Sequence, residues 1–180
     1  MASTTSNRRR VSRSSERHAV RIRLAETADL GFLAENHRAM AWETERKRLD
    51  TAVVRRGTRA VLRDPARGFY LVADLDGQPA GQLLVTHEWS DWRDGDFWWI
   101  QSVFVRPAFR RAGVYRMLHA AVSVLAENAP GVRGLRLYAA RTNRSAQQTY
   151  EKLGMKKTPY VVYEQLVRRG GRGRGGSRRG

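Results

Sequence analysis

The chain has 180 residues, of which 41% are hydrophobic, and this is enough for one folded domain with its own core. It contains no cysteine, which excludes disulfides, thiolate metal ligands and a cysteine nucleophile. Lysine and arginine number 34 against 17 aspartates and glutamates, so the net charge is +17. No apolar run approaches the roughly 20 residues that span a bilayer. We therefore expect a cytoplasmic protein that does not enter the membrane.

The positive charge gathers at the two ends of the chain. Residues 1–18 carry five arginines and one glutamate, and residues 167–180 carry six arginines and no acid, which leaves +7 for residues 19–166. Both ends lack the apolar residues that a core needs, so we expect two disordered basic tails around one domain. A solubilising role is the simpler interpretation. Arginine-glycine runs also bind nucleic-acid phosphates, so nucleic acid stays open as a partner of the tails.

Hydrophobic periodicity predicts a mixture of strands and helices between the tails. In chain order they are a strand at 19–24, helices at 27–41 and 45–62, strands at 69–73, 79–89 and 97–105, a helix at 114–125, a strand at 135–139, a helix at 145–153 and a strand at 158–166. Asp76-Gly77 is a typical hairpin turn between two of these strands. Because hairpins alternate with helical crossovers, we expect an α/β protein with a mixed sheet.

The loop between the strand at 97–105 and the following helix has features of a phosphate site. It contains Arg110, Arg111 and Gly113 directly before the helix. The N-terminus of a helix offers unpaired N–H donors and a positive dipole, glycine lets the backbone approach a ligand, and arginine adds charged donors. Taken alone, the same residues also suit an ordinary helix start with solvated arginines.

Two motifs resemble the signatures of the GCN5-related N-acetyltransferase (GNAT) family. The first is the strand and helix around Arg110-Arg-Ala-Gly113, and the second is the stretch from Asn143 to Met155. The second motif matches at Asn143, Ala146, Tyr150, Leu153 and Gly154. The resemblance spans about residues 20–166 and implies a mixed, mostly antiparallel sheet of six to seven strands flanked by about four helices. It also implies an enzyme, monomeric or homodimeric, that transfers acetyl from acetyl-CoA to a small-molecule or peptide amine by direct attack.

The resemblance further implies which residues bind acetyl-CoA. The loop and helix start would hold the pyrophosphate through backbone amides, the preceding strand would pair with the pantetheine amides, and the asparagine of the second motif would contact the cofactor. These residues are Arg110, Arg111, Ala112, Gly113, Val114 and Tyr115, then Val103, Phe104 and Val105, and finally Asn143. Tyr115 departs from the family, which usually has glycine or alanine there, so its side chain must point away from the cofactor.

Acetyl transfer to an amine needs a proton for the departing thiolate and a route for the amine proton to leave. The matching tyrosine of the family protonates the thiolate, so the resemblance makes Tyr150 the candidate acid. From spacing alone, a tyrosine packed in the core is the alternative.

The general base is less clearly marked. Many relatives place an acid on the strand before the loop, where this chain has Gln101 and Ser102. Glu88, at the end of the preceding strand, and Glu43, between the first two helices, are the candidate bases, with Glu45 a further carboxylate nearby. Any of them also fits an ordinary surface carboxylate.

Histidines and aromatic residues complete the candidates. His37 and His87 are further candidate bases near pH 7, but His37 falls on an apolar helix face and suits a packed core residue better. No histidine or acid cluster has metal-ligand spacing, so we expect no metal. The aromatic residues Trp89, Trp92, Phe97, Trp98 and Trp99 fit a core and hairpin, or an acceptor pocket in which Glu43, Glu88 and Asp91 attract a cationic amine.

The function that competes with acetyl transfer is that of a nucleic-acid-associated binding protein that keeps this fold and uses its tails.

Overall fold

The computed structural model describes residues 19–167, which divide into one compact unit up to Ala140 and another from Arg141. The first unit contains β1 (Val20–Leu24), α1 (Leu30–Glu45), α2 (Thr51–Arg63), β2 (Phe69–Leu75), β3 (Gln78–Ser90), β4 (Gly95–Val105), α3 (Val114–Glu127) and β5 (Val132–Arg136). The second unit contains α4 (Arg144–Lys152). The tails predicted at 1–18 and 167–180 lie outside the described residues, apart from Val167.

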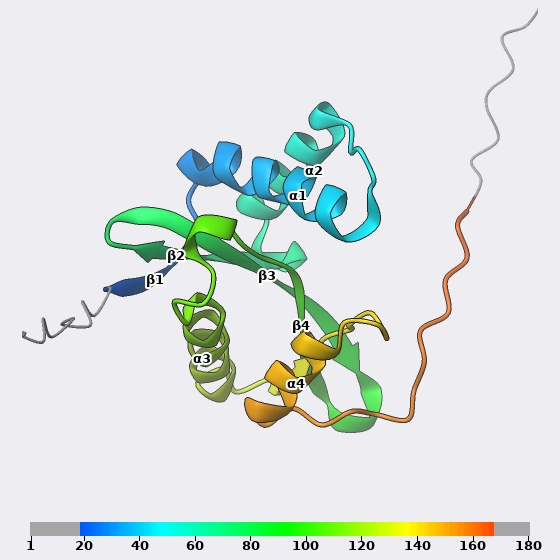
Figure 1. The fold of residues 1–180 in the computed structure, drawn as a ribbon. Helices are drawn as coiled ribbons and strands as arrows, with labels where there is room; N and C mark the ends of the chain where they lie inside the picture. Colours follow the sequence, from blue (N-terminus) through cyan, green and yellow to red (C-terminus); the bar gives the residue numbers. More distant parts are fainter. Residues whose placement is uncertain (1–18, 168–180) are drawn as a thin grey trace, which may run out of the picture. The chain divides into compact units, whose positions relative to one another are not determined.

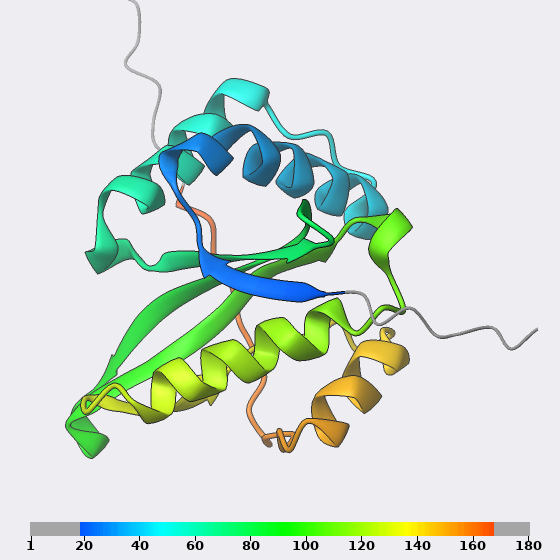
Figure 2. The ribbon, with the colours of Figure 1, turned by 90° about the vertical axis from the view of Figure 1, so that its left-hand side faces the viewer.

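The first unit is a five-stranded sheet between two layers of helix. The strands lie in the order β1-β2-β3-β4-β5, and every neighbouring pair is antiparallel except β4 and β5. The helix α3 makes the crossover between the two parallel strands. Figures 1 and 2 show α1 and α2 on one face of the sheet and α3 on the other. The predicted α/β class with a mixed sheet is confirmed, with five strands in the described residues instead of six to seven.

Each face of the sheet has its own core, because alternate strand residues point to opposite sides. On the α3 face, Leu83 and Val85 of β3 pack with Leu118 and Val122 of α3. On the opposite face, Leu33 of α1 joins a cluster with three strand residues, which are Tyr70, Val72 and Leu84. These two cores hold β3 and β4 between the helix layers of the first unit, and those strands carry much of the candidate site.

Several predicted boundaries differ from the structure. The second helix begins at Thr51 rather than at 45, because the Asp50 carboxylate accepts a hydrogen bond from the Val53 N–H at 2.8 Å and starts the helix there. The strand predicted at 135–139 lies at Val132–Arg136. The strand predicted at 158–166 is wrong, because this segment is exposed and has no regular structure. An alternating pattern favours a strand only where a neighbouring strand supplies hydrogen bonds.

Within residues 19–167, no helix is both long enough and apolar enough to cross a membrane.

Candidate active site

The strands β4 and β5 separate halfway along β4. Their ladder runs from the Asp96–Val132 pair to the Trp99–Arg136 pair, where β5 ends. Beyond Trp99, the residues of β4 that pair in the described sheet do so with β3 alone. Among residues 19–167, no strand therefore pairs with the second edge of Val103, Phe104 and Val105. The backbone N–H and C=O groups that face this edge can pair with an extended ligand that carries amide groups, and the Val105 carbonyl, which already accepts from the Arg110 Nε, has a second lone pair for it.

A β-bulge lies in β4 at the start of this unpaired stretch. The β3–β4 register shifts between Gln82 and Leu84, and Ser102 has a φ of 47°. Gln82 is fully buried beside the bulge, and its Nε2 donates to the Ser102 carbonyl at 3.5 Å. Its Oε1 accepts from the Asn36 Nδ2 at 3.1 Å. The Asn36 Oδ1 in turn accepts from the Arg106 Nε at 3.1 Å.

These contacts tie α1, the bulge and the end of β4 together through side chains that are almost completely buried. Gln82 and Asn36 are 0% and 2% exposed. Neither residue was among the sequence candidates, and no motif marked them. They are separated by 46 positions in the chain, so only the folded structure brings them together.

The loop after β4 leaves the start of α3 open to a ligand. Gly113 is the residue before α3 and has a φ of 78°, a conformation that glycine adopts without strain. Because glycine has no side chain to cap the helix, the first N–H groups of α3 keep their capacity to bind an anion. Arg111 also has a positive φ, of 68°.

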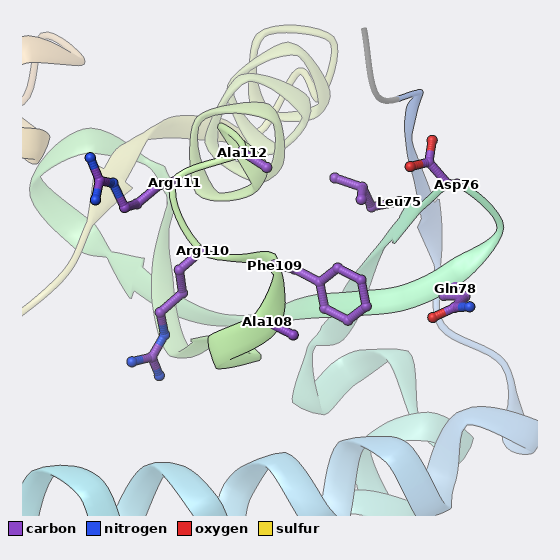
Figure 3. A pocket seen from close by; sticks show the side chains of 8 residues that line it. All are labelled: Leu75, Asp76, Gln78, Ala108, Phe109, Arg110, Arg111 and Ala112. Atoms are coloured by element: carbon purple, nitrogen blue, oxygen red, sulfur yellow. The ribbon is translucent and has the colours of Figure 1, made fainter. Parts of the chain in front are cut away.

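The side chain of Arg110 forms hydrogen bonds within the protein. Its Nη2 donates to the Glu43 carboxylate of α1 at 2.7 Å, and its Nε donates to the Val105 carbonyl at 3.0 Å. Figure 3 shows Arg110 pointing toward a helix below the loop, while Arg111 points away from the β2–β3 hairpin. Phe109 and Ala112 point toward that hairpin and line a cavity of about 590 Å³ with Leu75, Asp76 and Gln78. Arg111 is therefore the better placed of the two arginines to meet a phosphate.

A second cavity, of about 760 Å³, lies between α1 and the end of β4. Aromatic and charged side chains line it, and these include Trp42, Glu43, Arg46, Phe104, Arg106 and Phe109. Its two carboxylates are both engaged, because Glu35 pairs with Arg106 at 3.1 Å and Glu43 pairs with Arg110.

Glu88 lies at the point where β4 and β5 separate. Its carboxylate accepts from the Trp99 Nε1 and, at 2.8 Å, from the Arg136 Nη1. Trp99 and Arg136 are the last pair of the β4–β5 ladder. The ring centroids of Tyr138 and Trp99 are 5.9 Å apart, and the Arg136 guanidinium lies 3.7 Å from the Phe97 ring centroid. The carboxylate thus lies at the end of the β4–β5 ladder, within an aromatic cluster.

His37, His87 and Trp98 pack against aromatic side chains of the sheet, whereas Trp92 is exposed. His37 contacts the Tyr70 hydroxyl at 3.0 Å, and burial lowers the pKa of His37. Burial also raises the pKa of Tyr70 to about 12. His87 and Phe69 both contact the Trp98 ring on the α3 side of the sheet. Trp92 is 88% exposed, and among residues 19–167 no group of histidines and acids could hold a metal ion.

The second unit contains the remaining two sequence candidates. Asn143 caps α4, because its Oδ1 accepts from the Ala146 N–H at 3.1 Å. Its side chain thus performs the capping role that was the alternative to a cofactor contact. Tyr150 lies on α4, and burial raises the pKa of its phenol.

Comparison with known proteins decides the family. The model of the acetyltransferase (GNAT) family matches residues 29–155. The chain belongs to this family. It is 37% identical to a protein of known structure, a possible acetyltransferase from Clostridium difficile 630, with a TM-score of 0.78 over 83% of this chain and 99% of that one. A search of curated proteins found no match.

More distant structures share the GNAT fold. An aminoglycoside N-acetyltransferase, AAC(6')-Iy in complex with CoA, is 20% identical, with a TM-score of 0.66 over 83% of this chain and 95% of that one. A ribosomal-protein-alanine N-acetyltransferase from Brucella melitensis biovar Abortus 2308 is 19% identical, with a TM-score of 0.65 over 83% and 100% of the two chains.

The predicted site residues of this GNAT acetyltransferase fall into three groups. The strand and loop from Val103 to Tyr115 form a continuous stretch of the first unit, and Glu43 is linked to it through Arg110. Glu88 lies apart from that loop, at the end of the β4–β5 ladder. Asn143 and Tyr150 belong to the second unit.

Proposed function

We propose that this GNAT acetyltransferase transfers the acetyl group of acetyl-CoA to a primary amine by direct attack. The unpaired edge of β4 beyond Trp99 carries the proposal, because it offers backbone groups for the amides of pantetheine beside a helix start that suits a pyrophosphate. The CoA complex of the similarly folded aminoglycoside acetyltransferase supports the same ligand. No metal takes part in the proposed reaction. The cytoplasmic location and the monomeric or homodimeric state stay predictions.

We assign the cofactor contacts as follows. The backbone of Val103, Phe104 and Val105 pairs with pantetheine, and the amides from Arg111 to Tyr115 hold the pyrophosphate. Arg110 orders the loop through its contacts with Val105 and Glu43. The family motif supports a cofactor contact by Asn143, in addition to its capping of α4.

We propose Glu88 as the group that receives the amine proton, directly or through water. It accepts from both members of the last β4–β5 pair, so it stands where the strands separate. Glu43 was an equal candidate from sequence, and both carboxylates pair with an arginine, so their positions decide between them: the partner of Glu43 is Arg110 of the loop, which supports a role in ordering the loop. Tyr150 remains the proposed acid, on the strength of the motif it belongs to.

Two measurements test the proposal. Titration calorimetry with acetyl-CoA tests binding, and a thiol-release assay over a panel of primary amines tests transfer. Absence of acetyl-CoA binding would refute the proposed function.

Glu88→Gln is expected to lower kcat by about 10²-fold, the usual contribution of a general base, with little change in the KM for acetyl-CoA. Glu43→Gln is expected to raise that KM instead.

A matched pair of variants tests the loop. Gly113 has a positive φ, and an added Cβ meets only the Arg116 side chain, at 4.0 Å. Gly113→Asn is therefore expected to retain most of the acetyl-CoA affinity, since asparagine tolerates this conformation, whereas Gly113→Val is expected to lose it. Equal affinity in the two variants would contradict the assigned loop geometry.

A further inference from the structure

The folded part of the chain carries most of its excess positive charge on one helical hairpin. Residues 38–63, which cover the second half of α1, the loop after it and all of α2, contain eight basic and three acidic residues, a net +5. Residues 19–167 as a whole carry +7, from 23 basic and 16 acidic residues. This surface favours an anionic ligand over a cationic one.

Trp42 and Arg46 of this hairpin line the cavity beside α1, and Arg48 also contacts the Trp42 ring. The Arg46 guanidinium lies 5.8 Å and the Arg48 guanidinium 5.5 Å from the ring centroid of Trp42, which is 46% exposed. Neither arginine pairs with a carboxylate within residues 19–167. A guanidinium held against an aromatic ring keeps its N–H edge available to a carboxylate or phosphate.

The acids that could attract a cationic amine to this cavity are already neutralised. Glu35 pairs with Arg106, and Glu43 pairs with Arg110. In the part of the chain that the structure describes, Arg46 is the one charged group of the cavity lining that has no ion-pair partner. The earlier expectation that Glu43 attracts a cationic acceptor therefore does not suit this surface.

The backbone at Arg46 adds a separate observation. Arg46 ends α1 with a φ of 55°, in the left-handed region where helices usually end in glycine. A side chain kept in this conformation costs about 1 kcal/mol or more, so its presence favours a role for the side chain.

We propose that Arg46 and Arg48, supported by Trp42, bind an anionic group of the acceptor, so that the enzyme acetylates amines that also carry a carboxylate or a phosphate. This inference rests on the proposed acetyl transfer and adds the chemical class of the acceptor. The apolar lining of the cavity, which includes Phe104 and Phe109, suits a hydrocarbon segment between the amine and the anion.

Matched probes test this subsite in the CoA-saturated protein. Aminohexanoate is compared with aminohexanamide, and aminohexyl phosphate with aminohexanol, by titration calorimetry. Within each pair the amine is the same and only the anion differs, so the two pairs distinguish a carboxylate site from a phosphate site. We expect at least one anionic probe to bind about tenfold more tightly than its neutral partner, the gain from charge-assisted hydrogen bonds.

Variants locate the effect. Arg46→Gly combined with Arg48→Ala is expected to abolish the preference for the anion, while the Tm stays the same or rises because glycine suits the helix end. The control combines Arg55→Ala with Arg56→Ala, which removes the same charge from exposed positions of α2 and is expected to change the preference by less than about twofold.

The outcomes separate the inference from the proposed function. Equal binding of anionic and neutral probes, failure of all probes to bind, or an unchanged preference in the Arg46/Arg48 variant would overturn the inference. An equal loss in the Arg55/Arg56 control would also overturn it, because the effect would then be a general field. A loss of affinity for CoA itself would assign the arginines to the cofactor. If the wild-type protein does not bind CoA, the proposed function fails first.

Discussion

Tyr150 is the residue whose protonation state matters most for the proposed chemistry. A phenol is protonated at neutral pH, and burial raises the pKa of Tyr150 further, so the hydroxyl of this proposed acid has a proton for the departing thiolate. Tyr150→Phe is therefore expected to lower kcat by about 10²-fold and to leave the affinity for acetyl-CoA within about twofold. Single-turnover kinetics and calorimetry measure the two effects. Tyr160→Phe, at an 84% exposed position, is the control, and wild-type turnover in the Tyr150 variant would refute the assignment.

Gln82 is a second residue with a testable role, as a positioning residue for the bulge in β4. Its amide both accepts from Asn36 and donates to the Ser102 carbonyl. In Gln82→Glu, a neutral carboxyl reproduces both bonds, whereas a carboxylate loses the donor and buries a charge. The ordinary pKa of a glutamate is about 4.3, and burial raises the pKa of this new carboxyl in the folded protein above that value. The variant therefore loses stability as the pH rises from about 4.3 through the raised pKa of the folded state.

We expect Gln82→Glu to lose about 1–3 kcal/mol of unfolding free energy at pH 7 and to approach the wild type near pH 4. Its affinity for acetyl-CoA should follow the same pH profile, which a purely structural role far from the ligand would not produce. Gln78→Glu, at an exposed position, is the control and should show no such recovery. A pH-independent deficit would contradict the role of the donor.

At the scale of elements, Arg23 connects β1, β2 and the entry to α1. Its guanidinium pairs with Asp29 at 2.7 Å and with Asp74 at 2.8 Å, and these carboxylates are only 9% and 14% exposed. The hydrogen bonds from Arg23 lower the pKa of Asp29 below its ordinary value near 3.9. The unfolded chain therefore binds this proton more readily, so the stabilisation is complete above about pH 4 and is lost as the pH falls below it.

Asp29→Asn is expected to cost about 1–3 kcal/mol of unfolding free energy at pH 7, because the charged hydrogen bonds are lost from a buried site. The difference from the wild type should shrink in urea unfolding below pH 4, where the wild-type carboxylate also becomes protonated. Asp64→Asn provides the control, since its pair with Arg67 is largely exposed and should contribute less than about 1 kcal/mol. A deficit that persists at low pH would show that the charge is not responsible.

The elements that the sequence predicted well are those with a local cause. The stripe of α3 and the turn at Asp76-Gly77 depend on spacing and on turn residues, and both are present. The segment 158–166 and the shifted β5 depend on pairing with distant strands, which alternation cannot specify.

The same distinction applies to the site. The glycine-bearing loop was visible in the sequence because a loop and a helix start are local features. The contacts of Asn36 with Gln82 and with Arg106, and the Glu43–Arg110 pair, join α1 to the strands and loop across 46 to 70 positions. No spacing in the sequence could predict them. The positive φ of Ser102 is also set by the neighbouring strand, since serine does not favour that conformation.

At the scale of the whole molecule, the net charge divides into parts with different expected roles. The ends, residues 1–18 and 168–180, contribute +10, and most of the remaining +7 lies on the α1–α2 hairpin. If the ends bind nucleic acid, each phosphate they contact makes the affinity fall with salt, with a slope of about −0.7 per contact on a single strand. Acetyl transfer by the folded part should not depend on these contacts.

A protein reduced to residues 19–167 separates these roles. We expect its kcat/KM for a small amine to stay within about twofold of the full chain, because every proposed site residue is retained. Its affinity for single-stranded RNA should fall, and the salt slope should become shallower, since the arginines of both ends are gone. Fluorescence anisotropy at several salt concentrations measures this. An unchanged slope would rule out binding through the ends and assign any remaining attraction to the hairpin, where Arg55→Ala with Arg56→Ala should then reduce it.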